Sequence, residues 1–155
     1  MGIAATSVMQ ASLEQFKKSI REQRDRIEDR FVRDLREIAS LAFKTAVGFS
    51  PVDTGSYVTS HRIGIGHIDP SFTLHFTPGA NMSAMKAEAL SRELSKIEAI
   101  NKVSVIYLSN RVPHAINVEF TGWWTDNGFV PPYMVYNATR QILRAYIHSK
   151  KSMSR

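Results

Sequence analysis

The chain of 155 residues is 43% hydrophobic and 22% charged, with a net charge of +6, a composition typical of one globular domain. It contains no cysteine, which excludes disulfides and thiolate metal sites. No apolar run approaches the ~18 residues of a membrane span, and the N-terminus lacks the basic and apolar regions of a signal peptide.

The positive charge is concentrated at the C-terminus, where residues 133–155 hold five Lys or Arg and no Asp or Glu. Such a run is a solvated end that aids solubility, or it contacts nucleic acid or an acidic protein surface. The first ten residues are small and weakly patterned. We expect a flexible N-terminus over 1–10, a single α+β domain over 11–148 and a basic flexible tail over 149–155.

A long helix is predicted from Ser12 to Gly48. Its apolar residues recur mostly at spacings of three and four, and they form a narrow stripe on a highly charged rod. A helix this long and charged extends beyond the core of a small domain. We expect it to pack against a neighbouring subunit or, alternatively, to break near residue 24 and lie across one sheet. The stripe consists of Leu13, Phe16, Ile20, Ile27, Phe31, Leu35, Ile38 and Ala42.

The segment Pro-Val-Asp-Thr-Gly at 51–55 predicts a tight turn after this helix. Pro51 prevents the helix from continuing, Asp53 can bond the local backbone in an Asx-turn, and Gly55 can adopt φ > 0. The Asp-Thr-Gly triplet also occurs in aspartic proteases, where two such carboxylates share a proton. Those triplets lie in mostly β domains, whereas a long helix precedes this one. We therefore interpret Pro51, Asp53 and Gly55 as a structural turn.

Two strands are predicted next, over 57–68 and 72–76, and their alternating patterns favour a hairpin closed by the turn at 69–71. The glycines Gly64 and Gly66 indicate a bulge or the close approach of another chain segment. A helix capped by Ser83 should then run to about residue 100, with an imperfect apolar stripe.

A third strand is predicted over 103–109, where β-branched residues alternate with others. Pro113 then favours the first turn of a short helix, on which Val112, Ile116 and Phe120 would share one face; a strand remains the alternative. Glu119 lies between two apolar residues. It is either exposed on this helix or half-buried in a salt bridge.

An irregular segment over 122–132 is predicted before the last helix, which begins near Tyr133. Trp123, Trp124 and Phe129 lie there among residues that favour turns. We expect them to form a docking loop for a neighbouring subunit or partner; alternatively, they fold back onto the domain. The predicted fold class is α+β, a small antiparallel sheet packed with a long N-terminal helix, a middle helix and a C-terminal helix.

Two motifs carry a family resemblance. The first is Pro-Val-Asp-Thr-Gly at 51–55, and the second is a strand ending in Asn, followed by Pro-His-Ala and by Glu-Phe-Thr-Gly. Together they resemble the lambdoid-type tail-completion, head–tail joining and tail terminator proteins of tailed phages. His114 departs from the family, which usually has Tyr there. The second motif comprises Asn110, Pro113, His114, Ala115, Glu119 and Gly122.

The resemblance implies a non-enzymatic virion protein at the head-proximal end of a phage tail. Such proteins form rings, commonly hexamers, that terminate the tail and join it to the head connector. The implied partners are further copies of the chain, the tail tube protein and the head connector or stopper protein. DNA is a further candidate contact of the basic C-terminus. The resemblance implies no cofactor and no membrane, and it places assembly in the host cytoplasm.

Other chemistries find weaker support in the sequence. The five histidines show no HExxH motif and no (i, i+4) ligand pair, so we predict neither a metal site nor a catalytic centre. His61 and His75 would meet across the predicted hairpin but lack a third ligand. The alternative function is a small basic nucleic-acid-binding module, supported by the charge of 133–155 and by Tyr133, Tyr136 and Tyr146.

Overall fold

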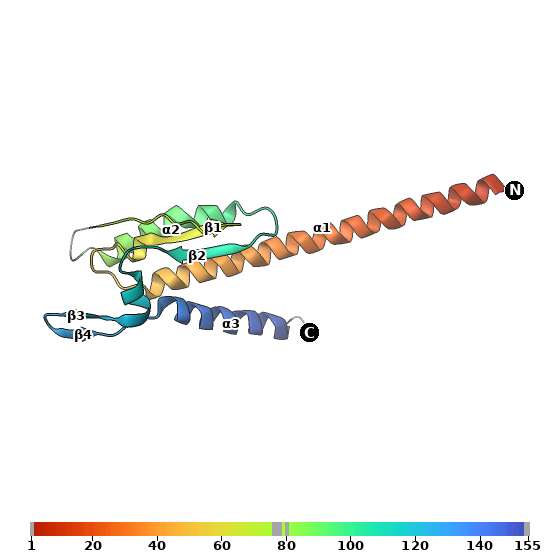
Figure 1. Ribbon diagram of the computed structural model, residues 1–155. Coiled ribbons are helices and arrows are strands. Elements are labelled where there is room, and N and C mark those ends of the chain that lie inside the picture. Colours follow the sequence, from red (N-terminus) through yellow and green to blue (C-terminus); the bar gives the residue numbers. More distant parts are fainter. Residues whose placement is uncertain (1, 76–78, 80, 154–155) are drawn as a thin grey trace.

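The computed structural model describes residues 2–75, 79 and 81–153, with side chains described over 9–75, 79 and 81–151 (Figure 1). It confirms an α+β fold with three main helices and small antiparallel sheets. The helices are α1 (Gly2–Phe49), α2 (Met82–Glu98) and α3 (Val135–Met153). The strands are β1 (His61–Ile65), β2 (Ile106–Asn110), β3 (Trp123–Thr125) and β4 (Gly128–Val130).

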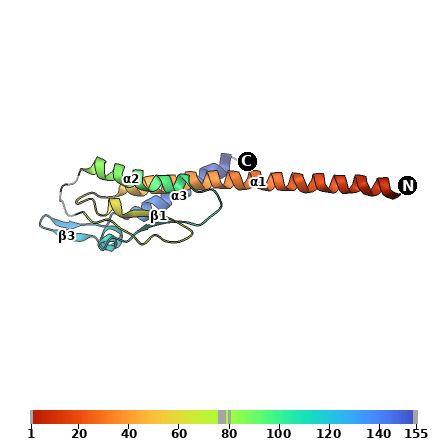
Figure 2. The same ribbon diagram turned by 90° about the horizontal axis from the view of Figure 1, so that it is seen from above.

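Helix α1 is continuous, and its N-terminal half projects away from the rest of the molecule (Figures 1 and 2). Every residue from 9 to 31 is exposed, and burial begins at Val32. Ion pairs along the rod, such as Lys18 with Glu22 at 4.0 Å, contribute only weakly at this exposure. The prediction of a break near residue 24 is therefore wrong, and only the C-terminal half of α1 packs on the domain.

The core lies where this C-terminal half meets the β1–β2 sheet and helix α2. Phe43 and Val47 of α1 are fully buried there, with Ile63 of β1 and Ala89 and Ile97 of α2. A second cluster continues toward α3 and comprises Ala46, Tyr57, Val112, Val118 and Val135. Because both clusters share the last turns of α1, this half of the helix organises the domain.

The predicted hairpin of 57–68 with 72–76 is wrong. Strand β1 instead pairs antiparallel with β2, from His61 opposite Asn110 to Ile65 opposite Ile106. The residues before β1 form a 3₁₀ turn, Val58–Ser60, in which Ser60 N–H bonds to Tyr57 O at 3.1 Å. Their backbone groups are satisfied locally and cannot form a ladder. Residue 76 lies outside the described residues.

The short helix after Pro113 is confirmed, but its predicted face is wrong. It ends in a π-helical turn, Asn117–Thr121, closed by a bond from Gly122 N–H to Asn117 O at 2.8 Å. Ile116 and Phe120 are exposed, whereas Val118 and Glu119 are buried. A π turn holds more residues than an α turn, so a stripe counted at α-helical spacing points in the wrong direction.

Three further predictions need correction. Helix α2 is capped by Asn81, whose Oδ1 accepts from Ala84 N–H at 2.9 Å, rather than by Ser83. The segment 122–132 is a hairpin of β3 and β4 rather than irregular. Helix α3 begins at Val135 and continues to Met153, so helix covers most of the segment 149–155 that we assigned to a flexible tail.

Candidate functional site

The two motifs of the sequence lie next to each other and line one groove of about 370 Å³. The turn after α1 forms one wall, and the short helix and β3 form the other. Both motifs are therefore parts of one structural unit, although they are separated by more than 50 residues of sequence. The groove is lined by Pro51, Asp53, Thr54, Gly55, Tyr57, His114, Asn117, Val118 and Trp123.

The turn at 51–55 depends on Gly55 and Thr54. Gly55 has φ +90°, which strains any residue with a side chain, and a Cβ there would also lie 2.7 Å from Sδ of Met85. Thr54 Oγ1 accepts from Ser56 N–H at 3.3 Å. Asp53 is exposed and makes no hydrogen bond among the described residues. The predicted Asx-turn at Asp53 is therefore wrong, and a threonine hydroxyl takes its place.

Asn110 of the second motif connects the sheet to this turn. Its Nδ2 donates to Tyr57 O at 2.8 Å, and its Oδ1 accepts from Val112 N–H at 3.2 Å. One amide side chain thus holds the end of β2 against the segment that follows the turn. Pro113 and His114 are exposed beyond it, so His114 lines the groove rather than packing in the core.

Glu119 is buried, with 5% of its surface exposed. It accepts hydrogen bonds from the hydroxyl of Tyr57 and from the backbone N–H of Tyr136, the latter at 3.1 Å. Burial, together with this carboxylate, raises the pKa of Tyr57. Neither predicted alternative for Glu119 is correct, because the carboxylate is neither exposed nor in a salt bridge. Its hydrogen bonds join the turn, the short helix and the start of α3.

His61 forms a second buried polar centre beside it. Its Nε2 lies 2.7 Å from Ser50 Oγ, and its Nδ1 lies 3.0 Å from the Tyr136 hydroxyl. Ser50 Oγ donates to Ala46 O at 2.7 Å, so it accepts from Nε2–H. Burial lowers the pKa of His61 to about 3, which keeps the ring neutral. The Ser50–His61 pair is buried, and the Ser50 hydroxyl donates its proton to Ala46 O rather than to the histidine. The histidine therefore cannot activate this hydroxyl as a nucleophile.

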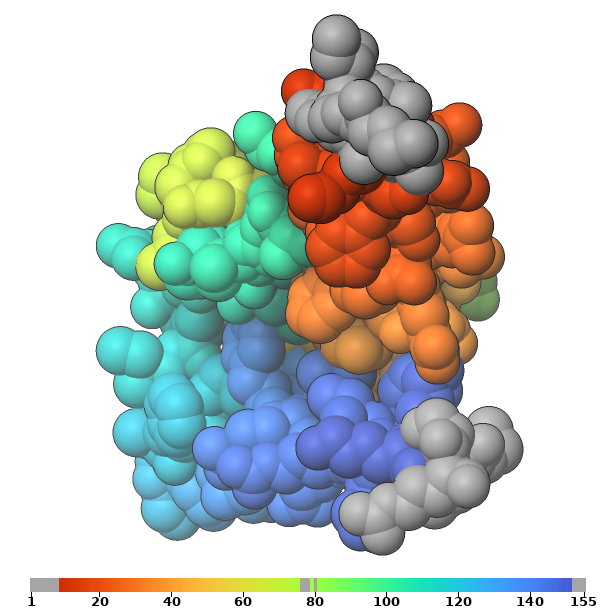
Figure 3. Space-filling model, turned by 90° about the vertical axis from the view of Figure 1, so that its right-hand side faces the viewer, coloured from red at the N-terminus to blue at the C-terminus, as the bar shows by residue number. Residues whose placement is uncertain are grey.

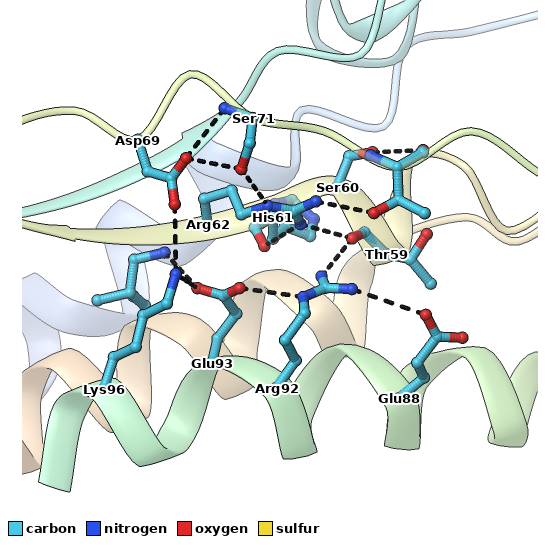
Figure 4. A network of polar contacts seen from close by, with 12 residues as sticks. Thr59, Ser60, His61, Arg62, Asp69, Ser71, Glu88, Arg92, Glu93 and Lys96 are labelled. Atoms are coloured by element: carbon cyan, nitrogen blue, oxygen red, sulfur yellow. Dashed lines mark hydrogen bonds and ion pairs between the residues drawn. The ribbon is translucent and has the colours of Figure 1, made fainter.

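A third polar network covers the free edge of β1 and was not predicted (Figure 4). The buried Glu93 of α2 accepts from Ile63 N–H at 2.9 Å and pairs with Lys96 at 2.8 Å. Arg62 donates to the hydroxyls of Ser71 and Thr73 in the segment that follows β1, and to the backbone carbonyl of His61. Its bond to His61 and the bond of Glu93 to Ile63 satisfy backbone groups of a strand edge that would otherwise be open. Glu93 lies four residues after Ala89 and four before Ile97, on the buried face of α2, and this spacing is the one signal from which the sequence could have predicted its burial.

The three aromatic residues of the predicted docking loop have different surroundings. Trp123 stacks on Tyr133 with ring centroids 5.9 Å apart and packs against the second core cluster. Trp124 is 79% exposed, and Phe129, directly opposite it on β4, is 49% exposed. Because successive side chains of a strand point to opposite faces, Trp123 faces the domain whereas Trp124 and Phe129 face outward. Gly122 lies where the chain enters β3. It has φ +68°, and the Val130 carbonyl occupies the place where a Cβ would lie.

The described part of the chain contains no cluster of three His, Asp or Glu side chains placed to hold a metal ion. Within the same residues, no helix is both long enough and apolar enough to cross a bilayer. Comparison with protein-family models, with curated proteins and with solved structures gives no match.

Proposed function

We propose that the protein is a non-enzymatic structural subunit that forms a ring, commonly sixfold in the family it resembles, at the head-proximal end of a phage tail. The ring would terminate the tail tube and join it to the head connector. The observation that carries this proposal is the projecting half of α1, whose apolar stripe has no partner among the described residues. The stripe residues Leu13, Phe16, Ile20, Ile27 and Phe31 are each at least half exposed, as is Met9 one turn before them.

Six large apolar side chains lie along one face of the projecting helix, and each is at least half exposed. Single exposed apolar residues are normal on a protein surface, whereas apolar residues gathered in one patch mark sites of association. Two of the six are the aromatic residues Phe16 and Phe31, which have large areas to bury against a partner. The stripe therefore has the character of one side of an interface.

The two motifs support a structural role. Their polar residues bond to one another or to backbone groups: Asn110 to Tyr57 O, Thr54 to Ser56, and Glu119 to Tyr57 and Tyr136. Such bonds hold the turn, the short helix and the start of α3 in a defined arrangement. The hairpin presents Trp124 and Phe129 to a partner, and aromatic side chains of this kind commonly dominate interface energies.

The three tyrosines that favoured a nucleic-acid-binding module each contact another side chain of the protein. Tyr136 is bonded to His61, Tyr133 stacks on Trp123, and Tyr146 donates to Glu37. Lys150 pairs with Asp34 at 3.3 Å and with Glu37. Bases that stack on a protein need open aromatic faces, so the basic run of α3 would at most supply phosphate contacts.

The copy number of the protein in purified virions or tails tests the proposal. Electron microscopy should locate several copies around the tail axis at the head-proximal end. A particle that contains one copy, or none, overturns the ring. The reading frames that neighbour the gene provide a second check, because portal, capsid and tail-tube genes are expected beside it.

A further inference from the structure

Strand β2 has one edge with unsatisfied backbone groups. Gly66 N–H bonds to Val105 O at 2.8 Å, just beyond the paired register of β1 and β2. Hydrogen-bonded pairs in an antiparallel ladder recur every second residue. The N–H and C=O groups of Ile106 and Leu108 therefore point away from β1. Ile63 of β1 shows the same alternation. Its backbone N–H points away from β2 and bonds to the side chain of Glu93 in α2.

The two edges of the β1–β2 sheet differ in whether their outward backbone groups have hydrogen-bond partners. The edge of β1 is covered by Glu93 of α2. On the edge of β2, the outward backbone groups of Ile106 and Leu108 have no partner among the described residues. Unpaired strand edges are templates for another strand, and proteins normally cover them.

An apolar groove of about 340 Å³ lies beside the open edge, between β2, α1 and α3. The space-filling view from the end of the molecule looks along this region, between α3 and the segment that leads into β2 (Figure 3). Thr139 lines the groove; it is buried, and its hydroxyl has no hydrogen-bond partner. The apolar lining includes Leu35, Ile38, Ala42, Ile106, Leu108 and Leu143.

A second open edge lies in the segment Phe72–His75, which follows β1. The backbone N–H and C=O of Thr73 bond to the hydroxyl of Ser60 at 2.9 and 2.8 Å. Those of His75 bond in the same way to the hydroxyl of Ser56, at 2.7 and 2.8 Å. On one side of this segment, the Ser56 and Ser60 hydroxyls thus make the backbone hydrogen bonds that a neighbouring strand would otherwise make.

The other side of the segment is free. Because backbone groups alternate along an extended chain, the N–H and C=O of Phe72 and Leu74 point away from the serines, and they have no partner among the described residues. The two side chains are 44% and 45% exposed. The chain therefore carries an exposed extended segment with an apolar face.

We propose that the segment Phe72–His75 of one copy adds as a strand to the β2 edge of the next copy. This inference rests on the proposed ring and specifies one of its contacts. Backbone groups of Phe72 and Leu74 would bond those of Ile106 and Leu108, which is strand addition to an open edge. In such a pair, bonded residues direct their side chains to the same face, so Phe72 and Leu74 enter the apolar groove.

The pairing is heterologous, because it joins two different edges of the same chain. Repetition of such a contact produces a closed ring if the rotation closes and an open chain if it does not. Two copies that joined β2 to β2 would instead make an isologous dimer and leave the segment Phe72–His75 unused. The two arrangements predict different cross-links.

Single cysteines distinguish them, since the chain has no native cysteine. In the proposed antiparallel pair, Phe72 lies opposite Leu108 and Leu74 lies opposite Ile106. Thr73 then lies opposite Tyr107 in a non-hydrogen-bonded position, where Cα atoms approach to about 4.5 Å, within disulfide range. Thr73→Cys protein is mixed with Tyr107→Cys protein and oxidised, and His75→Cys protein is treated in the same way as a control for the register. We expect a mixed disulfide with Thr73→Cys, little or none with His75→Cys, and no cross-link in any protein alone. Cross-linking of Tyr107→Cys with itself, or none with Thr73→Cys, overturns the proposal.

Charge substitutions on the exposed segment provide the second measurement. Phe72→Asp and Leu74→Asp should leave the melting temperature unchanged and reduce self-association at least tenfold, measured by sedimentation. Ile68→Asp is the matched control, because Ile68 is 49% exposed and lies outside the segment. If virions contain a ring and these variants still join it normally, strand addition is wrong while the proposed function stands. If the mixed disulfide forms but virions lack multiple copies, strand addition stands and the ring function is wrong.

Discussion

At the scale of single residues, the domain is held together by buried polar side chains whose burial the sequence did not predict. His61, Glu93 and Glu119 are buried, and each bonds to backbone or hydroxyl groups from another part of the chain. A buried polar group without such partners costs free energy. These three residues therefore make the fold depend on the relative positions of α1, β1, α2 and the short helix.

Substitution of Glu119 should destabilise the domain in a graded way. Glu119→Gln keeps an oxygen acceptor but places an amide N–H₂ among donors, and we expect a cost of about 1–3 kcal/mol in the free energy of unfolding. Glu119→Ala, which leaves both donors unpaired, should cost more. Urea unfolding measures both. Equal stability of all three proteins would contradict the role given to the carboxylate.

His61 should make stability depend on pH. Burial lowers its folded-state pKa to about 3, below the value near 6.5 of the unfolded chain. The unfolded state therefore binds the extra proton first, and stability is lost as pH falls below about 6.5, at up to about 1.4 kcal/mol per pH unit. Urea unfolding at pH 7.5, 6.5 and 5.5 should show this slope. Burial also lowers the pKa of His114, so the slope should become shallower in His61→Gln rather than vanish, and it should persist in His67→Gln, where the histidine is exposed.

At the scale of the elements, boundaries are set by a few positions with special backbone requirements. Gly122 links the π turn to β3 with positive φ and no space for a side chain. Gly48, in the last turn of α1, has open space where a Cβ would lie. The same amino acid is therefore required at one boundary and replaceable at the other.

Alanine at these two glycines should have opposite effects. Gly122→Ala combines strain of about 1–3 kcal/mol for positive φ with a clash against Val130 O, so we expect a loss of at least that size. Gly48→Ala should stabilise by about 0.5–1 kcal/mol, because alanine loses less entropy in a helix. Thermal unfolding of the two variants compares them directly. A tolerated Gly122→Ala would show that the hairpin entry is not constrained.

The β3–β4 hairpin should separate into a structural and a docking half. Trp123→Ala removes a side chain stacked on Tyr133, and we expect a lower melting temperature. Trp124→Ala removes a side chain that is 79% exposed, so the melting temperature should hold within a few degrees while head–tail joining fails. Joining is scored by electron microscopy of infected-cell lysates. Normal joining with Trp124→Ala, Phe129→Ala would remove the docking role.

At the scale of the whole molecule, the two halves of α1 differ. The C-terminal half, from Val32, packs in the core of the domain, and the N-terminal half projects away from it. The projecting half exposes its apolar stripe, and among the described residues no hydrogen bond or ion pair joins residues 9–31 to another element. Most helical stability in proteins comes from the packing of an apolar face, so a partner on the stripe would stabilise this half.

Charges in the stripe should therefore affect assembly and not the fold. Phe16→Asp and Ile20→Asp are expected to keep the domain's melting temperature and to abolish incorporation into tails. Gln15→Asp, on the charged side of the same turn, is the matched control. Incorporation is measured by complementing a phage that lacks the gene. Equal incorporation of all three variants would show that the stripe has no partner in the virion.

The sequence by itself determined the helices, the turn at 51–55, strand β2 and the α+β class, because periodicity and turn chemistry act over a few residues. It also singled out Asn110, Gly55 and Gly122 as members of the two motifs. Only the tertiary structure decided that β1 pairs with β2, that Glu119 and Glu93 are buried, and that the π turn reverses the expected face. The strand pairing and the two buried carboxylates depend on contacts between residues 30 to 62 positions apart. Long-range contacts of this kind leave no periodic signal, because the partner that satisfies a buried donor or carboxylate can come from any part of the chain.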